Sequence, residues 1–249
     1  MNESKRKSDK PGQYTDKQII SRRLFLKEVS LVSLTAISGS ALLQACAPAP
    51  PQPTTVLPAV PGPVNKQAAA APMTVLEAFK NRKSTNAFQT QPLPKETLLE
   101  LLWAAWGINR PDSGKRTAPS AVNAQEIDIY VLLAEGAFVY DAKANQLMPV
   151  VSQDLRPKSS MQAFMKDAPI HLIFVADNAK YRNIPQAQRE LFSSSHTGFI
   201  GQNVYLYCAA YGLGAHFYAS VDRSGLKTSL KLRDDQSVIF GQAVGYPKE

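Results

Sequence analysis

Arg82, Lys83 and Ser84 stand together directly after a stretch that favours a helix. A guanidinium can grip phosphate oxygens with its planar fork, and a neighbouring hydroxyl and a second cation would strengthen that hold. The same residues are also explained as solvated charges at the end of a helix, where cations are favoured. The spacing alone therefore leaves open both a phosphate site and an ordinary helix end.

A second polar segment precedes a predicted strand. Asn123 and Gln125 alternate there with apolar Val122 and Ala124. Their amides can bind a ligand, or they can satisfy backbone groups of an ordinary loop in which Ser120 caps a short turn. The residue types again leave both interpretations open.

Other chemistries find little support in the sequence. The three histidines, His171, His196 and His216, do not have the spacing of metal ligands, and His216 is best explained as a core or edge residue. No serine–histidine–aspartate order, glycine-rich phosphate loop or pair of carboxylates stands out. We therefore predict no metal site and assign no catalytic side chain.

The N-terminal region carries targeting features. Ser21-Arg22-Arg23-Leu24-Phe25-Leu26-Lys27 precedes an apolar run that ends at Leu43-Gln44-Ala45-Cys46. The first block resembles a twin-arginine export signal and the second a lipobox, where Cys46 would be acylated. We predict a signal over residues 1–45 and a lipid-anchored, extracytoplasmic protein in the periplasm or on the cell surface. An uncleaved N-terminal anchor is the alternative.

The composition divides the rest of the chain. Residues 47–72 contain eight prolines and no aromatic residue, so residues 46–72 are predicted to form an extended tether. Residues 73–249 are long enough for one domain with its own core. Half of the net charge of +8 lies in residues 1–45, and no basic block follows, which argues against a nucleic-acid partner.

The pattern of apolar residues predicts an α+β fold in which helices cover both faces of one small, mostly antiparallel sheet. Cys208 falls in an apolar helical pattern and is interpreted as a buried small hydrophobe. Residues 109–119 are predicted to be a loop. Thr74 and Glu77 are predicted to form a capping box at the start of the first helix, and the continuous apolar run at 170–176 is predicted to be a central strand buried on both faces. Helices are predicted over 75–82, 95–107, 159–167, a long region after Pro185 that ends at Gly212, and 224–232; strands are predicted over 127–133, 137–140, 146–151, 170–176, 215–220 and 238–244.

Four segments, in order, resemble one family. They are Arg82–Phe88, Ala118–Gln125, the stretch from Gly201-Gln202-Asn203 to Gly212-Leu213-Gly214, and Gly241–Pro247. Together they resemble the nitroreductase-like FMN oxidoreductases. The resemblance implies an α/β/α sandwich, an FMN cofactor and a homodimer in which the Pro119–Asn123 loop reaches the flavin held mainly by the other subunit. The flavin-contacting positions that it implies are Arg82, Lys83, Ser84, Asn86, Pro119, Ser120, Asn123, Gln125, Phe217, Tyr218, Ala219, Ser220 and Lys248.

Two positions depart from the family pattern. Asn86 stands where the box usually has lysine or arginine, and Lys248 is what remains of a basic tail that touches phosphate in many relatives. A charge-assisted hydrogen bond is worth about 1.5–3 kcal/mol, so each missing partner would weaken FMN binding about tenfold or more. The alternative is that Lys115, Arg116 or Arg110 from the loop takes the place of the missing partner.

The expected activity is ping-pong transfer of electrons through FMN to a quinone, nitroaromatic or similar small acceptor. Because NAD(P)H is not expected outside the cytoplasm, a membrane quinol or redox partner is the expected donor, or else the enzyme is an oxidase. The alternative is an inactive module that binds flavin or another small ligand on the same fold. A solute-capturing lipoprotein is a weaker third interpretation.

Overall fold

The computed structural model describes residues 73–248. The predicted signal (1–45), the tether (46–72) and Cys46 lie outside the described residues. Among residues 73–248, no helix is both long and apolar enough to span a bilayer. The helices are α1 (Val75–Asn81), α2 (Lys95–Trp106), α3 (Arg156–Ser159), α4 (Gln186–Ala210) and α5 (Arg223–Ser229), and the strands are β1 (Ile108–Arg110), β2 (Lys115–Arg116), β3 (Ile127–Leu133), β4 (Gly136–Asp141), β5 (Gln146–Val151), β6 (Ile170–Asp177), β7 (Gly214–Tyr218) and β8 (Gln236–Gly245).

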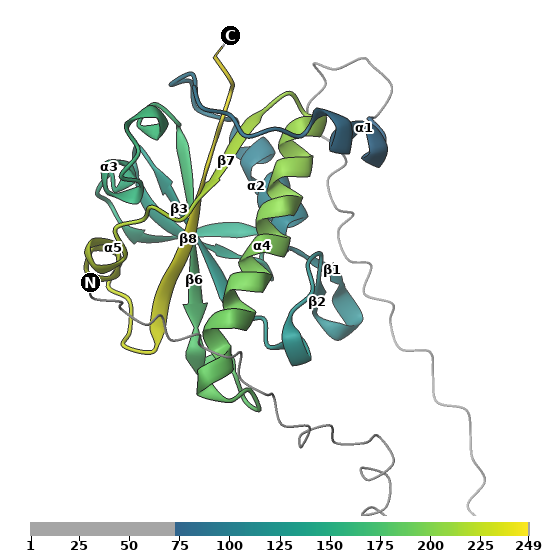
Figure 1. The fold of residues 1–249 in the computed structure, drawn as a ribbon, viewed down its shortest axis with the longest axis vertical. Helices are drawn as coiled ribbons and strands as arrows, with labels where there is room; N and C mark the ends of the chain where they lie inside the picture. The colour runs from purple at the N-terminus through teal and green to yellow at the C-terminus, as the bar shows by residue number, and fades with distance from the viewer. Residues whose placement is uncertain (1–72, 249) are drawn as a thin grey trace, which may run out of the picture. The chain divides into compact units, whose positions relative to one another are not determined.

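One six-stranded sheet organises the fold. Its strand order is β5-β4-β3-β6-β8-β7, and every neighbouring pair runs antiparallel. All eight residues of β6 are buried, which confirms the central strand predicted from its continuous apolar run. Because β8 covers only one side of β7, the other side of β7 is an edge of the sheet (Figure 1).

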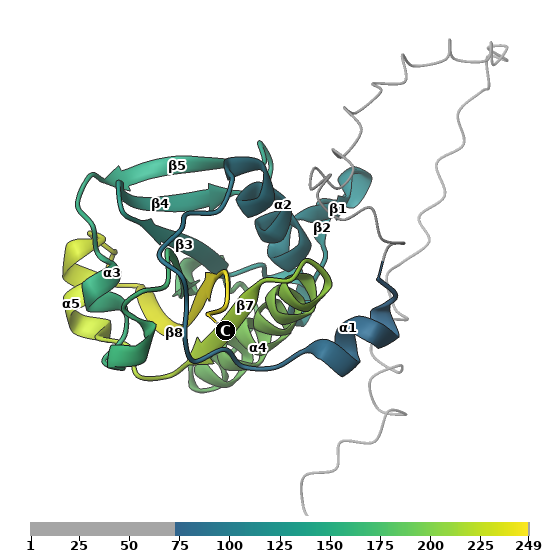
Figure 2. The same cartoon turned by 90° about the horizontal axis from the view of Figure 1, so that it is seen from above.

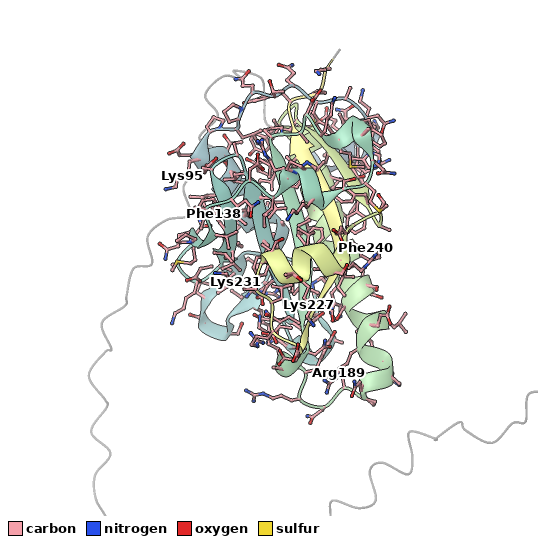
Figure 3. The ribbon with its side chains drawn as sticks, turned by 90° about the vertical axis from the view of Figure 1, so that its left-hand side faces the viewer. Lys95, Phe138, Arg189, Lys227, Lys231 and Phe240 are labelled. Atoms are coloured by element: carbon pink, nitrogen blue, oxygen red, sulfur yellow. The ribbon has the colours of Figure 1, made fainter. Side chains whose placement is uncertain are left out.

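Helices cover both faces of the sheet, as predicted. The core on one face is formed mainly by α2, α4 and the sheet, with Trp106 and Ile200 fully or almost fully buried. The core on the opposite face includes Leu226 of α5 and Leu155, next to α3. Figure 2 shows α2 and α4 on one side of the sheet and α3 and α5 on the other, and Figure 3 shows α5, with Lys227 on it, lying over its face. The chain therefore has the predicted α+β fold.

Local signals set the ends of the helices. Thr74 and Glu77 form the predicted capping box, in which the Thr74 hydroxyl accepts the Glu77 amide (3.2 Å) and the Glu77 carboxylate accepts the Thr74 amide (2.7 Å). At the end of α4, Gly212 has φ +67°, a left-handed conformation that suits glycine. The amide of Leu213 then donates to the carbonyl of Cys208 (2.8 Å), which closes the helix and turns the chain into β7.

The predicted helix over 159–167 is wrong. The helix α3 ends at Ser159, Ser160–Gln162 is not helical, and a short 3-10 turn follows at Ala163–Met165. The serines compete with the helix, because the Ser159 hydroxyl donates to the Arg156 carbonyl (2.7 Å) and the Ser160 hydroxyl accepts the Gln162 amide (3.1 Å). The Met161 amide donates to the Ser220 carbonyl (3.1 Å), so this segment is bound to the end of β7.

Two further boundaries differ from the prediction. The predicted loop over 109–119 contains a small antiparallel hairpin of β1 and β2, whose turn passes through Gly114 at φ +61°. The strand predicted over 215–220 ends at Tyr218, because its register with β8 stops at Gly241.

Candidate functional site

The predicted phosphate-binding segment lies along the free edge of β7. Ser84 and Ala215 form a parallel bridge, and the Thr85 amide donates to the Ala215 carbonyl (2.9 Å). Phe88, which is fully buried, anchors the end of the segment beside Pro247. A Cβ at Gly214 would lie 2.6 Å from the Thr85 side chain, so this close approach requires glycine.

Tyr205 of α4 links this segment to β7. Its hydroxyl lies 2.9 Å from the Ser84 hydroxyl and accepts the backbone amide of Phe217 (2.8 Å). The guanidinium of half-buried Arg82 lies over the Tyr205 ring, 5.3 Å from its centre. We call Arg82, Ser84, Tyr205 and Phe217 the strand group. The sequence did not indicate Tyr205, because nothing in a helical pattern shows that a tyrosine hydroxyl will meet a strand amide.

A cavity opens beside the strand group. Its volume is about 480 Å³, and its lining includes Lys80, Lys83, Thr85, Tyr205 and Ala215. The two lysines, together with Arg82 above the Tyr205 ring, give this end of the molecule a positive character that suits an anion.

The end of β7 presents its side chains to opposite faces. The Phe217 ring packs against Phe174 and Phe240, with ring centres 5.8 and 5.1 Å apart. Tyr218 points to the other face, where its hydroxyl lies 2.9 Å from Nδ1 of buried His171. Ala219 is exposed, and the buried Ser220 hydroxyl has no hydrogen-bond partner among the described residues.

Burial controls ionisation beneath β7. It lowers the pKa of His171 to about 4, because the ring loses water and the charge of Asp154 offsets that loss only in part. Burial also raises the pKa of Tyr218 and, on the other face, of Cys208, so both stay protonated. Cys208 is only 1% exposed, as predicted for a small hydrophobe.

Asn86 and Lys248, which were also predicted to contact the cofactor, do not join the strand group. Asn86 is exposed. Lys248 is bound to the segment by its amide, which donates to the Ala87 carbonyl (3.0 Å), and its ammonium forms an ion pair with Asp167 (2.9 Å). The charge of Lys248 is therefore already partnered in this structure.

The second predicted segment is a loop with an unusual backbone. Val122, Asn123 and Gln125 have φ values of +48°, +55° and +50°, in the left-handed region that disfavours non-glycine residues. Val122 is both β-branched and 71% exposed. Such strain persists only where the surroundings impose it, and it concentrates at functional sites.

Side chains of the loop bond mainly to one another and to the nearby hairpin. The Ser120 hydroxyl accepts the Gln125 amide (3.1 Å), and the Gln125 side chain donates to Asn123 (3.0 Å) and to the Gly114 carbonyl (2.9 Å). Gln125 also accepts a hydrogen bond from Arg116 (2.8 Å). Asn123 and Gln125 thus satisfy local groups, while Pro119 and Val122 face solvent.

A buried acid and a histidine lie beneath this loop. Nδ1 of His196 lies 2.6 Å from Glu126, and the Ala121 amide donates to Nε2 of His196 (2.9 Å). Burial alone would raise the pKa of Glu126, but hydrogen bonds, chiefly from His196, leave it below its usual value. We call residues 120–125 with Glu126 and His196 the loop group. The sequence did not reveal this pair, whose members are 70 positions apart.

The two groups do not meet within one protomer. Tyr205 and His196 are nine positions apart on α4, which corresponds to about 13 Å along a helix. Figure 1 shows the segment after α1 beside the C-terminal end of α4, whereas the β1–β2 hairpin, which the loop contacts, lies toward the other end. The structure therefore brings Arg82 and Ser84 to Phe217 but leaves Pro119–Gln125 apart from them.

Comparison with known proteins places these features in a family context. A family model described as the nitroreductase family matches residues 79–246. A curated protein of Methanocaldococcus jannaschii that carries a nitroreductase name is 24% identical over 163 residues, which are 61% of this chain and 82% of that protein.

Solved structures share the fold. A crystal structure from Ralstonia eutropha, whose title also names a nitroreductase, is 38% identical, with a TM-score of 0.68 over 73% of this chain and 87% of that one. A chain of the Escherichia coli microcin synthetase complex has a TM-score of 0.62 at 13% identity, over 95% of this chain and 85% of that chain. The second likeness concerns the fold alone.

Proposed function

The chain belongs to the nitroreductase family, and from that premise we propose that it is an FMN-dependent oxidoreductase. The observation that carries the proposal is the strand group, in which Arg82, Ser84 and Tyr205 converge at the free edge of β7 beside a cationic cavity. When bound, FMN would supply the hydride and electron chemistry.

The residues present suit this cofactor. The Arg82 guanidinium and the Ser84 hydroxyl would hold the phosphate, and Lys83 on the cavity wall would add charge. The end of β7, at Phe217–Ser220, offers backbone amides and the unpartnered Ser220 hydroxyl for the polar edge of the ring system. The Phe217 amide is already taken by the Tyr205 hydroxyl, which holds the backbone where this edge begins.

A second copy of the chain would complete the site. The strained loop at 120–125 lies away from the strand group of its own protomer, so we propose a homodimer in which it reaches the partner's flavin. The outer faces of α1 and α4, which pack together, expose apolar side chains that a dimer would cover. Their exposed fractions are 67% for Val75, 72% for Leu76, 52% for Phe79, 67% for Leu191 and 48% for Phe199.

The setting of the enzyme is part of the proposal. The twin-arginine block and the Cys46 lipobox support export and a lipid anchor, with residues 46–72 as a tether. In that location, a membrane quinol or a redox partner would reduce the flavin, or the enzyme would react with oxygen. A quinone, nitroaromatic or similar small molecule would accept the electrons in the same pocket.

The alternative function is a binding module without turnover. It is favoured by the pairing of Lys248 with Asp167 and by the exposed Asn86, which leave fewer cations for the phosphate than the family pattern provides.

The visible absorption spectrum of the purified full chain tests the proposal. We expect a yellow protein whose flavin band bleaches reversibly with a quinol and returns with a quinone. Arg82→Ala should weaken FMN binding about tenfold or more, because it removes a charge-assisted contact. Arg223→Ala, which removes the same charge from the start of α5, should leave the affinity unchanged.

Each outcome separates the candidates. A colourless chain that takes up no added FMN would contradict both the enzyme and the flavin-binding module. A yellow chain that neither quinol nor NADPH bleaches would favour the module. Rapid bleaching by micromolar NADPH would argue against a dedicated extracytoplasmic donor.

A further inference from the structure

The bonding of His196 fixes where its proton lies. A backbone amide can only donate, so the hydrogen bond from Ala121 leaves Nε2 of His196 as an acceptor without a hydrogen. Nδ1 therefore carries the hydrogen and donates it to Glu126, 2.6 Å away. In this tautomer, Glu126, His196 and the Ala121 amide form one chain of hydrogen bonds from the core to the loop.

The surroundings of the pair contain few other polar groups. Glu126 is fully buried and His196 is 3% exposed, while the Glu126 Oε2 atom has no hydrogen-bond partner within residues 73–248. Tyr181, which follows a short 3-10 turn after β6, faces the same carboxylate, and its hydroxyl lies 2.9 Å from Ser193. Arg189 lies beyond it, 5.6 Å from the centre of the Tyr181 ring.

Two aromatic rings flank His196. The rings of Phe192 and Phe199 lie 6.1 and 6.3 Å from the His196 ring. No charged side chain other than Glu126 contacts His196 in the described part of the chain. The imidazole therefore has two defined contacts, one to the acid and one to the loop.

The loop at 120–125 keeps its conformation only through contacts with residues outside it. Its three left-handed residues are not glycine, so the backbone of residues 120–125 would relax to other conformations without contacts that impose this one. Gln125 ties one end of the loop to Arg116 and Gly114. The Ala121 amide ties the other end to His196.

We infer that His196, oriented by Glu126, is a positioning residue that holds the loop at 120–125 in the shape that it presents to the flavin of the partner subunit. This inference rests on the proposed function. A side chain at this position without an acceptor would leave the Ala121 amide without its partner, and the loop would be released.

Three measurements on the full chain and its variants test this inference. With only three histidines, ¹⁵N-histidine labelling resolves the tautomer of His196 by NMR. Hydrogen exchange of peptides that cover residues 119–126 reports the loop, and flavin fluorescence reports FMN affinity. In His196→Leu we expect the loop protection to fall and the Kd of FMN to rise about tenfold.

Two variants separate positioning from general stability. His196→Gln keeps an acceptor for the Ala121 amide and a donor for Glu126, so it should restore most of the loop protection and FMN affinity that His196→Leu loses. The control Asp128→Asn removes a carboxylate two positions from Glu126 that binds Lys180 (2.6 Å), and its loop protection should match that of the native chain.

The inference is overturned if exchange at 119–126 is unchanged in His196→Leu, or if His196→Gln loses as much protection as His196→Leu. If the chain binds no FMN, the proposed function fails, and the positioning of the loop is still decided by exchange and by the tautomer of His196.

Discussion

Tyr218, which follows Phe217 in β7, bonds to one buried histidine, and the loop group contains another; the two histidines are held in opposite ways. His171 of β6 bonds to the Tyr218 hydroxyl, and burial lowers its pKa to about 4. Beneath the loop, His196 bonds to ionised Glu126 and to the Ala121 amide. Burial keeps His171 neutral, whereas His196 lies next to the carboxylate of Glu126.

The strand group and the loop group keep their side chains in position by different kinds of structure. The strand group is regular structure, in which a parallel bridge at Ser84 and a strand amide at Phe217 fix the positions of the side chains. The loop group holds a left-handed backbone in place with a buried acid and a histidine.

The largest expected effect concerns His171. Between pH 6.5 and 4 the unfolded chain binds a proton at His171 that the native chain does not. The free energy of unfolding should therefore decrease as the pH is lowered through this range, by about 3 kcal/mol in total. Denaturant unfolding at several pH values measures this slope. In His171→Leu this part of the slope should vanish, and an equal slope in both proteins would contradict the assignment.

A smaller effect is expected at Tyr205. Tyr205→Phe leaves the Phe217 amide and the Ser84 hydroxyl without their partner, which should lower the free energy of unfolding by about 1–2 kcal/mol and weaken FMN binding several-fold. Thermal unfolding and FMN titration measure the two effects. The matched control is Tyr207→Phe in the same helix, whose hydroxyl has only a 3.5 Å contact to Thr97. Equal losses in both variants would show that the strand group has no special need for Tyr205.

The smallest effect should be a gain in stability at Val122. Asparagine tolerates the left-handed region better than a β-branched residue, so Val122→Asn should raise the free energy of unfolding by about 0.5–1 kcal/mol. Val75→Asn changes a similarly exposed valine in a right-handed helix and should give no gain. If both variants behave alike in denaturant unfolding, the loop carries no backbone strain.

The sequence predicted most of the elements because their signals are local. The apolar run at Ile127–Leu133 and the capping box at Thr74 are found where they were predicted. The helix expected over 159–167 failed because serine side chains bond to their own backbone, which a hydropathy pattern does not show.

The site was predictable only where its residues lie together in one short segment. Arg82 and Ser84 stand in a recognisable short segment, and the structure brings them to β7. Tyr205 and the Glu126–His196 pair depend on contacts between segments far apart in the chain, and no spacing marks them. The left-handed backbone at Val122 is also imposed by these contacts rather than by local preference.

The burial of Cys208 has a practical consequence for the predicted anchor. The chain contains two cysteines, and the thiol of Cys208 is enclosed and held protonated, so a maleimide added to the native protein should not reach it. Native labelling would then report the thiol at Cys46 alone, and a chain acylated there would stay unmodified until it is denatured.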